Sequence, residues 1–396
     1  MTERDRPLVA LGAWLPGSGF TRVLQSILPR LAETREVHWI GTAYRGSVRE
    51  VDGVTLHPSN LEGGDVYGGY GAARLAAEVG ATDVLVLKDL WMLKNCGAPF
   101  RDLPEATRVT AYVPLDGRLR DDALVEAVTF VDRLVAFTAF GRRQFEARLA
   151  RLGAEAGGAT TETATIPHGV DVSAFAPLDA DARREARARL LPHIPPDAFV
   201  VLNANRPVPR KRVDLTVEGF ARFARSRPEA HLRLHHAHLS PDEHAQLQSW
   251  IAASGVSDQI SVSSPEDGPL SEADLNALYN ACDVGLNTSD GEGWGLVSFE
   301  HAATGAAQIV PANSASGELW AGAAEIVPTV RRWSPPYTLV DSESVSAEGV
   351  AAALARLADD PEHRQQIAHA GYHRAHDPAF RWDAIAERWR RLFACR

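Results

Sequence analysis

Short runs of apolar residues alternate with longer amphipathic segments along the whole chain. In the first half, apolar runs predict strands at 8–14, 37–41, 83–88, 108–114 and 133–138. The segments 21–33 and 141–153 carry apolar residues at helical spacing and predict helices. This alternation is typical of strands linked by crossover helices in a parallel sheet.

The same pattern resumes in the second half. Apolar runs predict further strands at 199–205, 230–238, 260–264, 282–288 and 307–312, and 213–225 and 271–282 predict helices. Between the halves, 151–165 loses periodicity and is rich in Gly, Thr and Ala, which predicts a surface loop or a flexible connection. We therefore expect two similar α/β halves, whose ligands bind beyond the carboxyl ends of the strands.

Length and charge narrow the function classes. A chain of 396 residues exceeds the usual size of one hydrophobic core, so two domains are expected. The formal charge of -10 argues against nucleic acid or an anionic membrane as the main partner, although peripheral membrane contact stays open. The N-terminus lacks a signal-peptide pattern, no apolar run reaches membrane-span length, and the three cysteines have no paired spacing, which together predict a cytoplasmic protein.

The stretch DGEGWGLVSFEHAATGA at 290–306 places two glutamates among glycines and apolar side chains. Its alternating glycines are unfavourable for helix and strand, and suit a loop whose amides approach an anion at a helix N-terminus. Carboxylates such as Glu292 and Glu300 accept hydrogen bonds from the vicinal diols of sugars and riboses. The alternative is an ordinary amphipathic helix in which Glu300 faces solvent.

Two further loops at predicted strand ends carry candidate phosphate-binding groups. Gly17 and Gly19 follow the first strand and form either a phosphate-approach loop or a tight turn. After the strand at 199–205 comes a basic cluster of Arg206, Arg210, Lys211 and Arg212. These cations either neutralise a diphosphate leaving group or form an ordinary solvated charge run.

No metal site is predicted. The histidines between 231 and 238 have no acidic or cysteine partner close in sequence. Asp179 and Asp181 look like a helix N-terminus rather than a metal-binding aspartate pair at a strand end.

With these features in place, the sequence resembles retaining glycosyltransferases of the GT-B fold, specifically glycosyltransferase family 4 (glycosyltransferases group 1). EGWGLVSFE matches the family's two glutamates separated by seven residues, with Gly-aromatic-Gly between them. NRPVPRKR resembles its Arg, four residues, Lys signature at Arg206 and Lys211. IPHGVDVSAFAP resembles its interdomain segment, with His168 in place of the usual asparagine, and LYNACDVGLNTS and FRWDAIAERWRRL also fit.

The resemblance implies an α/β protein of the GT-B fold, with two Rossmann-like domains facing each other across a cleft. Residues 1–168 would form the acceptor domain and 169–378 the nucleotide-sugar domain. The helix at 379–396 would cross back to the N-terminal domain.

The resemblance also implies roles for individual residues. Glu300 would bind the ribose hydroxyls, Glu292 the hydroxyls of the donor sugar, and Arg206 and Lys211 the diphosphate. Further contacts to the nucleotide would come from Gly17 and Gly19 and from the backbone of Gly293, Trp294, Gly295, Leu296 and Val297. Asp116 stands where many members carry an acceptor-side histidine; the alternative is a turn aspartate before a glycine.

The function implied is a hexosyltransferase that moves a sugar from a nucleotide-sugar to an acceptor hydroxyl, with retention at the anomeric carbon. It would need no metal and no cofactor, because the nucleotide-sugar is itself the donor substrate. The alternatives are a phosphorylase or nucleotide-sugar epimerase of the same fold, or an inactive sugar-nucleotide-binding subunit. The sequence predicts neither the sugar, the nucleobase, the acceptor nor the oligomeric state.

Overall fold

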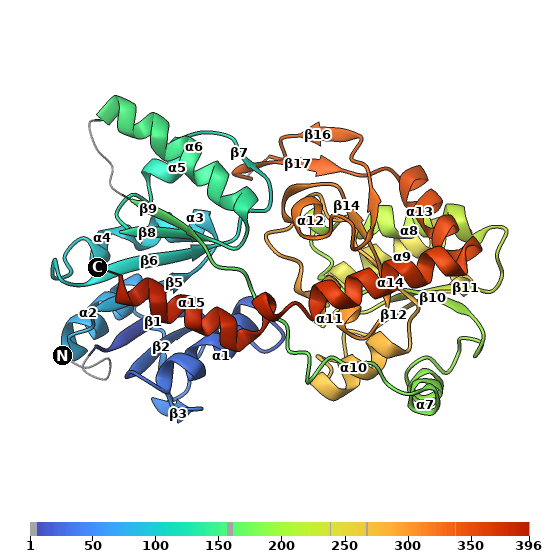
Figure 1. Cartoon of the computed structure of the whole chain (residues 1–396), viewed down its shortest axis with the longest axis horizontal. Coiled ribbons are helices and arrows are strands. Elements are labelled where there is room, and N and C mark those ends of the chain that lie inside the picture. Colours follow the sequence, from blue (N-terminus) through green and yellow to red (C-terminus); the bar gives the residue numbers. More distant parts are fainter. Residues whose placement is uncertain (1–5, 157–160, 238, 267, 337, 396) are drawn as a thin grey trace. The chain divides into compact units, whose positions relative to one another are not determined.

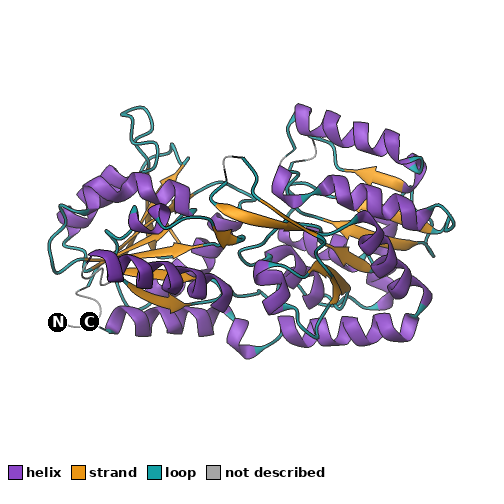
Figure 2. Cartoon of the chain, turned by 90° about the horizontal axis from the view of Figure 1, so that it is seen from above, coloured by secondary structure: helices purple, strands orange, loops and turns teal. Residues whose placement is uncertain are grey.

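The computed structural model describes residues 6–156, 161–237, 239–266, 268–336 and 338–395. The chain forms two compact units (Figure 1). Unit 1 comprises the described residues of 1–169, 336–340 and 382–396, and unit 2 those of 170–335 and 341–381. In each unit the strands lie between helices (Figure 2), which is the layering expected for parallel sheets.

Unit 1 contains an eight-stranded sheet in the order β3-β4-β2-β1-β5-β6-β8-β9. Its strands are β1 (Leu8–Ala13), β2 (Val37–Thr42), β3 (Arg49–Val51), β4 (Val54–Pro58), β5 (Asp83–Leu87), β6 (Arg108–Val113), β8 (Arg133–Ala136) and β9 (Glu162–Thr165). All neighbours pair in parallel except β3 and β4. The predicted strands of the first half are thus confirmed, because strands covered on both faces appear in the sequence as continuous apolar runs.

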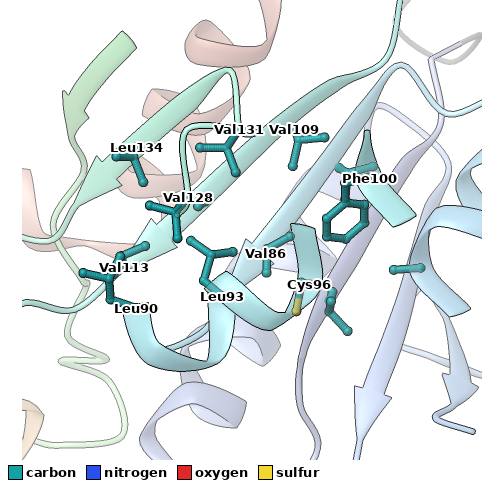
Figure 3. Packing of buried hydrophobic residues seen from close by; sticks show 14 of the residues in the cluster. Val86, Leu90, Leu93, Cys96, Phe100, Val109, Val113, Val128, Val131 and Leu134 are labelled. Atoms are coloured by element: carbon teal, nitrogen blue, oxygen red, sulfur yellow. The ribbon is translucent and has the colours of Figure 1, made fainter. Parts of the chain in front are cut away.

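The helices of unit 1 bury apolar faces at helical spacing. They are α1 (Gly19–Ala32), α2 (Gly69–Val79), α3 (Leu90–Leu93), α4 (Gly97–Phe100), α5 (Ala123–Glu126), α6 (Ala139–Ala156) and α15 (Trp382–Ala394). In α1, the residues at Val23, Leu24, Ile27, Leu28 and Leu31 are all buried. Figure 3 shows part of the core on which other helices pack, where Leu93 and Phe100 lie beside strand residues such as Val86 and Val109.

The end of the chain is built into unit 1. Helix α15 buries Ile385, Trp389 and Phe393. The buried Arg133 of β8 donates from Nη1 to the carbonyl oxygen of Leu392 at 2.7 Å. This guanidinium therefore satisfies a backbone carbonyl in the last turn of α15, which has no partner within the helix.

The prediction of a loop or flexible connection at 151–165 is wrong for most of that segment. Helix α6 continues to Ala156, and β9 adds Glu162–Thr165 to the edge of the sheet. Alanine and glutamate favour the helix at its start, and β-branched threonines favour the strand at its end. Residues 157–160 lie outside the described part of the chain.

Unit 2 contains a six-stranded, wholly parallel sheet in the order β12-β11-β10-β13-β14-β15. Its strands are β10 (Phe199–Asn203), β11 (Ala230–Leu234), β12 (Ile260–Val262), β13 (Val284–Leu286), β14 (Ala307–Pro311) and β15 (Glu325–Val327). Two shorter strands, β16 (Arg331–Trp333) and β17 (Val340–Ser344), pair antiparallel through residues 331–333 and 342–344. The predicted strands of the second half are also confirmed, although most end earlier than predicted.

Most helices of unit 2 connect one strand of the sheet to the next. They are α7 (Ala180–Leu190), α8 (Val213–Ala224), α9 (Pro241–Ser254), α10 (Glu272–Asn280), α11 (Leu296–Ala303), α12 (Ser314–Leu319), α13 (Ala347–Asp359) and α14 (Pro361–Ala375). Asp179 caps α7 by accepting from the amides of Asp181 and Ala182, as the sequence predicted. Helix α13 packs on α8, and α14 packs on α11.

Candidate active site

Two loops meet at the carboxyl edge of the sheet in unit 2. Strand β10 pairs in parallel with β13, so the chain segments that follow both strands emerge side by side at one edge. The segment after β13 stays buried from Asn287 to Trp294. It enters α11 through Gly295, whose φ of +96° lies in the left-handed region that glycine tolerates best.

Glu292 lies at the centre of this edge with only 3% of its surface exposed. Its Oε1 accepts from Lys211 Nζ at 2.5 Å, from Ser289 Oγ at 2.8 Å and from Asn287 Nδ2 at 3.0 Å. Its Oε2 lies 3.5 Å from Arg210 Nη1. The carboxylate thus collects donors from the loops after both β10 and β13.

Glu292 is held in its ionised form. Burial by itself raises the pKa of this carboxyl, but the charges of Lys211 and Arg210 and the hydrogen bonds from Lys211 and Ser289 outweigh it and lower the pKa to about 2. A carboxylate that stays charged at neutral pH is a strong acceptor for hydroxyl groups.

The backbone around this pair is fixed by local hydrogen bonds. The amide of Glu292 donates to Ser314 Oγ at 2.9 Å, and the same hydroxyl donates to the Glu292 carbonyl oxygen at 3.0 Å. Arg210 Nη1 donates to the carbonyl oxygen of Gly291, and the amide of Asp290 donates to the carbonyl oxygen of Arg210 at 2.8 Å. The two loops are therefore tied together through their main chains as well as through the ion pair.

Glu300 lies on α11 and is 3% exposed, so the alternative in which it faces solvent is wrong. Tyr279, near the end of α10, donates its hydroxyl to Glu300 Oε2 at 3.1 Å. The Tyr279 ring stacks on the neighbouring His301, with 5.2 Å between the ring centroids. The sequence placed Glu300 in the helix correctly but did not predict Tyr279 as its partner.

Trp294 packs within unit 2. Its ring stacks on Phe299 with 4.9 Å between centroids, and Phe380 meets it edge-on at 5.4 Å. Residues 293–295 immediately precede α11, and Leu296 and Val297 form its first turn. The backbone amides at these positions therefore lie at the helix N-terminus, where the positive end of the helix dipole favours an anion.

The four cations of the basic cluster have different surroundings in the structure. Lys211 and Arg210 contact Glu292, whereas Arg206 is exposed. The pKa of Glu243, at the start of α9, is lowered mainly by the hydrogen bond from the backbone N–H of Ser240. The positive charge of Arg206 is one of the smaller causes, so Arg206 lies near the start of α9. The fourth cation, Arg212, binds Asp214 at 2.7 Å and Asp290 at 3.3 Å.

Sequence reasoning missed several groups that support Glu292. Asn287 and Ser289 follow β13 directly, so polar residues at a strand end were the available signal. The sequence predicts Arg210 only as one cation of the basic cluster, not as a partner of Glu292. Its contact depends on the short 3₁₀ helix Pro209–Lys211, which neighbouring residues in the sequence did not reveal.

The remaining predicted residues belong to unit 1. Gly17 is exposed, has a φ of +75° and turns the chain between β1 and α1, and Gly19 is the first residue of that helix. Asp116 lies half-buried after β6. His168 is buried, and its Nδ1 lies 2.7 Å from the Tyr112 hydroxyl, so it packs in the core of unit 1.

The described residues contain neither a candidate metal site nor a candidate membrane span. No group of three or more His, Cys, Asp or Glu in that part of the chain is arranged to hold a metal ion, and His238 lies outside it. No helix in the same part is long and apolar enough to cross a membrane.

Comparison with known proteins identifies the fold. Sucrose-phosphate synthase from Thermosynechococcus elongatus has a similar structure, with a TM-score of 0.75 and 19% identity over 99% of this chain and 100% of that one. The chain has the GT-B fold. HepE from Anabaena, solved in complex with UDP-glucose, has the same fold, with a TM-score of 0.71 and 15% identity over 98% of this chain and 99% of that one.

Sequence comparison finds similarity to glycosyltransferases. Residues 210–391, which include Lys211 and both glutamates, match the model of a family described as glycosyl transferase-like. D-inositol 3-phosphate glycosyltransferase from Kineococcus radiotolerans is 29% identical over 316 residues. That match covers 74% of this chain and 62% of the relative, so the chain spans less than two thirds of that relative's length.

Proposed function

We propose that this protein is a retaining glycosyltransferase of family 4, which moves a hexose from a nucleotide-sugar to an acceptor hydroxyl without a metal ion. The observation that supports the proposal is the buried Glu292 and its ion pair with the largely covered Lys211, beside the N-terminus of α11. It combines a carboxylate suited to sugar hydroxyls with cations and amides suited to a diphosphate.

In this mechanism the protein positions the reactants and stabilises the charge of the leaving group. Glu292 accepts hydrogen bonds from the donor sugar, and Glu300 accepts them from the ribose. Arg206, Lys211 and the amides before α11 stabilise the diphosphate as its bond to the sugar breaks. The leaving diphosphate takes the proton of the acceptor hydroxyl as the new bond forms on the same face of the sugar, so the anomeric configuration is retained.

Known proteins suggest which substrates to test first. HepE was solved with UDP-glucose, so UDP-glucose is the first donor to try. The relative from Kineococcus radiotolerans is named for D-inositol 3-phosphate, so that compound is the first acceptor. A wider panel of nucleotide-sugars, screened by thermal shift, covers other donors, because a ligand that binds only the native state raises its apparent stability.

The decisive experiment follows the released nucleoside diphosphate and the configuration of the product. We expect release that depends on an acceptor and a product that keeps the donor's anomeric configuration by NMR. A requirement for free phosphate would favour a phosphorylase, interconversion of the donor without an acceptor would favour an epimerase, and an inverted product would exclude the family. Binding of the donor without turnover on any acceptor would favour the inactive subunit.

The role of Glu292 is tested by Glu292→Gln. We expect transfer to slow by at least about a hundredfold, as when one preorganised charged group is removed, while affinity for the free nucleoside diphosphate stays within about twofold of wild type. Glu218→Gln is the matched control, because Glu218 lies on α8 and pairs at the surface with Arg222. Equal loss of nucleotide affinity in Glu292→Gln and Glu300→Gln would contradict the proposed division of roles.

A further inference from the structure

A pocket of 360 Å³ lies in unit 2 at the edge of the sheet opposite to Glu292. Cys282 and Asp283, just before β13, and Ala306 and Ala307, at the start of β14, line it. These are the amino ends of the two strands, whereas Glu292 follows the carboxyl end of β13. The volume falls in the range of small-molecule sites.

The charge around this pocket is positive. Arg183 of α7 and Arg364 of α14 both line it. Among the described residues that line it, the one carboxylate is that of Asp283, which is neutralised by Arg183 at 3.0 Å and by Arg187 at 2.9 Å. Burial raises the pKa of Cys282 to about 12, so that thiol adds no negative charge at neutral pH.

Both lining guanidinium groups have donors beyond those used inside the protein. Arg183 donates from Nη2 to Asp283, and Arg364 donates from Nη1 to the carbonyl oxygen of Leu357 at 2.7 Å. A guanidinium carries five N–H donors in a planar fork that matches phosphate oxygens. The exposed side chain of Gln365 adds an amide donor one residue from Arg364.

One side chain connects the pocket with the opposite edge of the sheet. Tyr279 lines the pocket, and its hydroxyl donates to Glu300. The stacked His301 is neutral, because burial lowers its pKa to about 3. A molecule that displaces the Tyr279 ring would therefore move a hydrogen-bond partner of the carboxylate to which we assign the ribose.

We propose that this pocket is a second ligand site, which binds a small metabolite carrying a phosphate group. Arg183 and Arg364 bind the phosphate, and the rest of the volume holds the organic part. Occupancy changes nucleotide affinity through Tyr279 and Glu300; this second step, unlike the binding itself, rests on the proposed function.

Binding is measured by calorimetry with glucose 6-phosphate, and with glucose and inorganic phosphate for comparison. An Arg206→Ala background removes the exposed cation assigned to the diphosphate and keeps the Lys211–Glu292 pair. We expect glucose 6-phosphate to bind in this background, and Arg183→Gln/Arg364→Gln to weaken it by at least about tenfold, because charge-assisted hydrogen bonds are lost. Glucose should not bind, and binding of inorganic phosphate would show that the phosphate group is sufficient.

Arg184→Gln is the matched control, because Arg184 follows Arg183 on α7 but is 74% exposed and pairs with Asp181. It should leave affinity unchanged. Ala368→Leu fills part of the pocket without changing its charge and should also weaken binding of glucose 6-phosphate. This second variant keeps the test valid if the double arginine variant does not fold. Unchanged affinity in both pocket variants, or equal weakening in Arg184→Gln, would overturn the proposal.

The link to the nucleotide is measured as the change in UDP affinity caused by glucose 6-phosphate in otherwise wild-type protein. If glucose 6-phosphate instead competes with UDP for the nucleotide site, its effect on UDP affinity should persist in Arg183→Gln/Arg364→Gln. If it acts through the pocket, its effect should disappear in that variant. Tyr279→Phe should abolish the coupling and keep glucose 6-phosphate affinity, and coupling that survives it would contradict this route. Failure of UDP to bind would count against the proposed function, and leaves the calorimetric test of the pocket intact.

Discussion

Lys211→Met should leave Glu292 as a buried carboxylate that has lost its closest cation. The methionine side chain has a length similar to that of lysine, so the change removes charge more than volume. In the wild-type protein Lys211 Nζ lies 2.5 Å from the carboxylate, and the two side chains are 13% and 5% exposed. Breaking a buried pair on one side is strongly destabilising, because the remaining charge stays desolvated.

The size of the effect follows from the pKa of Glu292. The gap between about 2 in the folded protein and the ordinary value of 4.5 corresponds to about 3 kcal/mol. This is the net effect of Lys211, Arg210 and the hydrogen bonds from Lys211 and Ser289 acting against burial, so it sets only the scale of the loss. This estimate agrees with the range measured when one partner of a buried ion pair is removed, about 3 to 5 kcal/mol. We therefore expect Lys211→Met to reduce the free energy of unfolding by about 3 kcal/mol at pH 7.

The effect should depend on pH in a defined direction. In the wild type the folded-state pKa of Glu292 lies below the unfolded value, so its contribution is present above the ordinary value of 4.5 and is lost as the pH falls toward 2. In Lys211→Met, burial dominates and raises the folded-state pKa above the unfolded value. The variant then regains stability as the pH falls, and the difference between the proteins narrows from pH 7 to pH 4.

Urea unfolding followed by tryptophan fluorescence at pH 7, 5.5 and 4 measures this difference. Arg222→Met is the control, because Arg222 is an exposed partner of Glu218 on α8, and it should cause little change at any pH. The electrostatic interpretation of the Lys211–Glu292 pair would be refuted if Lys211→Met and wild type had nearly the same free energy of unfolding. It would also be refuted if the difference between their free energies of unfolding did not change with pH.

Three further predictions concern the proposed reaction. Glu300→Gln should weaken UDP binding as measured by calorimetry, because charge-assisted hydrogen bonds worth about 1.5 to 3 kcal/mol are lost; unchanged affinity would count against its role. Arg206→Ala should slow transfer by at least about a hundredfold if Arg206 stabilises the diphosphate, and near-normal turnover would return it to a solvated charge. Transfer should survive excess EDTA, and activity that chelation abolishes and manganese restores would rule out the metal-free mechanism.

The regular elements were the most predictable part of this protein. Parallel strands covered on both faces are continuous apolar runs, and amphipathic helices show their period in the sequence, so both signals are local. The loop at 290–295 was also predictable from the sequence, because its alternating glycines disfavour helix and strand. The strand β9 was missed because its Glu162–Thr165 sequence lies at the sheet edge and carries no apolar run.

The contacts that complete the candidate site were not predictable from local patterns. Tyr279 and Glu300 belong to different helices, and their hydrogen bond requires α10 and α11 to be packed. The preference for Arg210 over Arg206 beside Glu292 depends on the turn that ends at Arg212, whose φ is +47°. Such contacts depend on how elements pack and turn, whereas spacing along the chain reports only which elements form.

The incorporation of α15 into unit 1 has a consequence for protein synthesis. Residues 382–394 complete the core of unit 1 with Trp389 and Phe393, yet the ribosome makes them only after all of 170–381. At roughly 5 to 20 residues per second, unit 1 waits about 10 to 40 s with the apolar surface under α15 exposed. During that interval the nascent chain is a natural client for chaperones, and translation that stops before residue 382 yields a first unit that still exposes this surface.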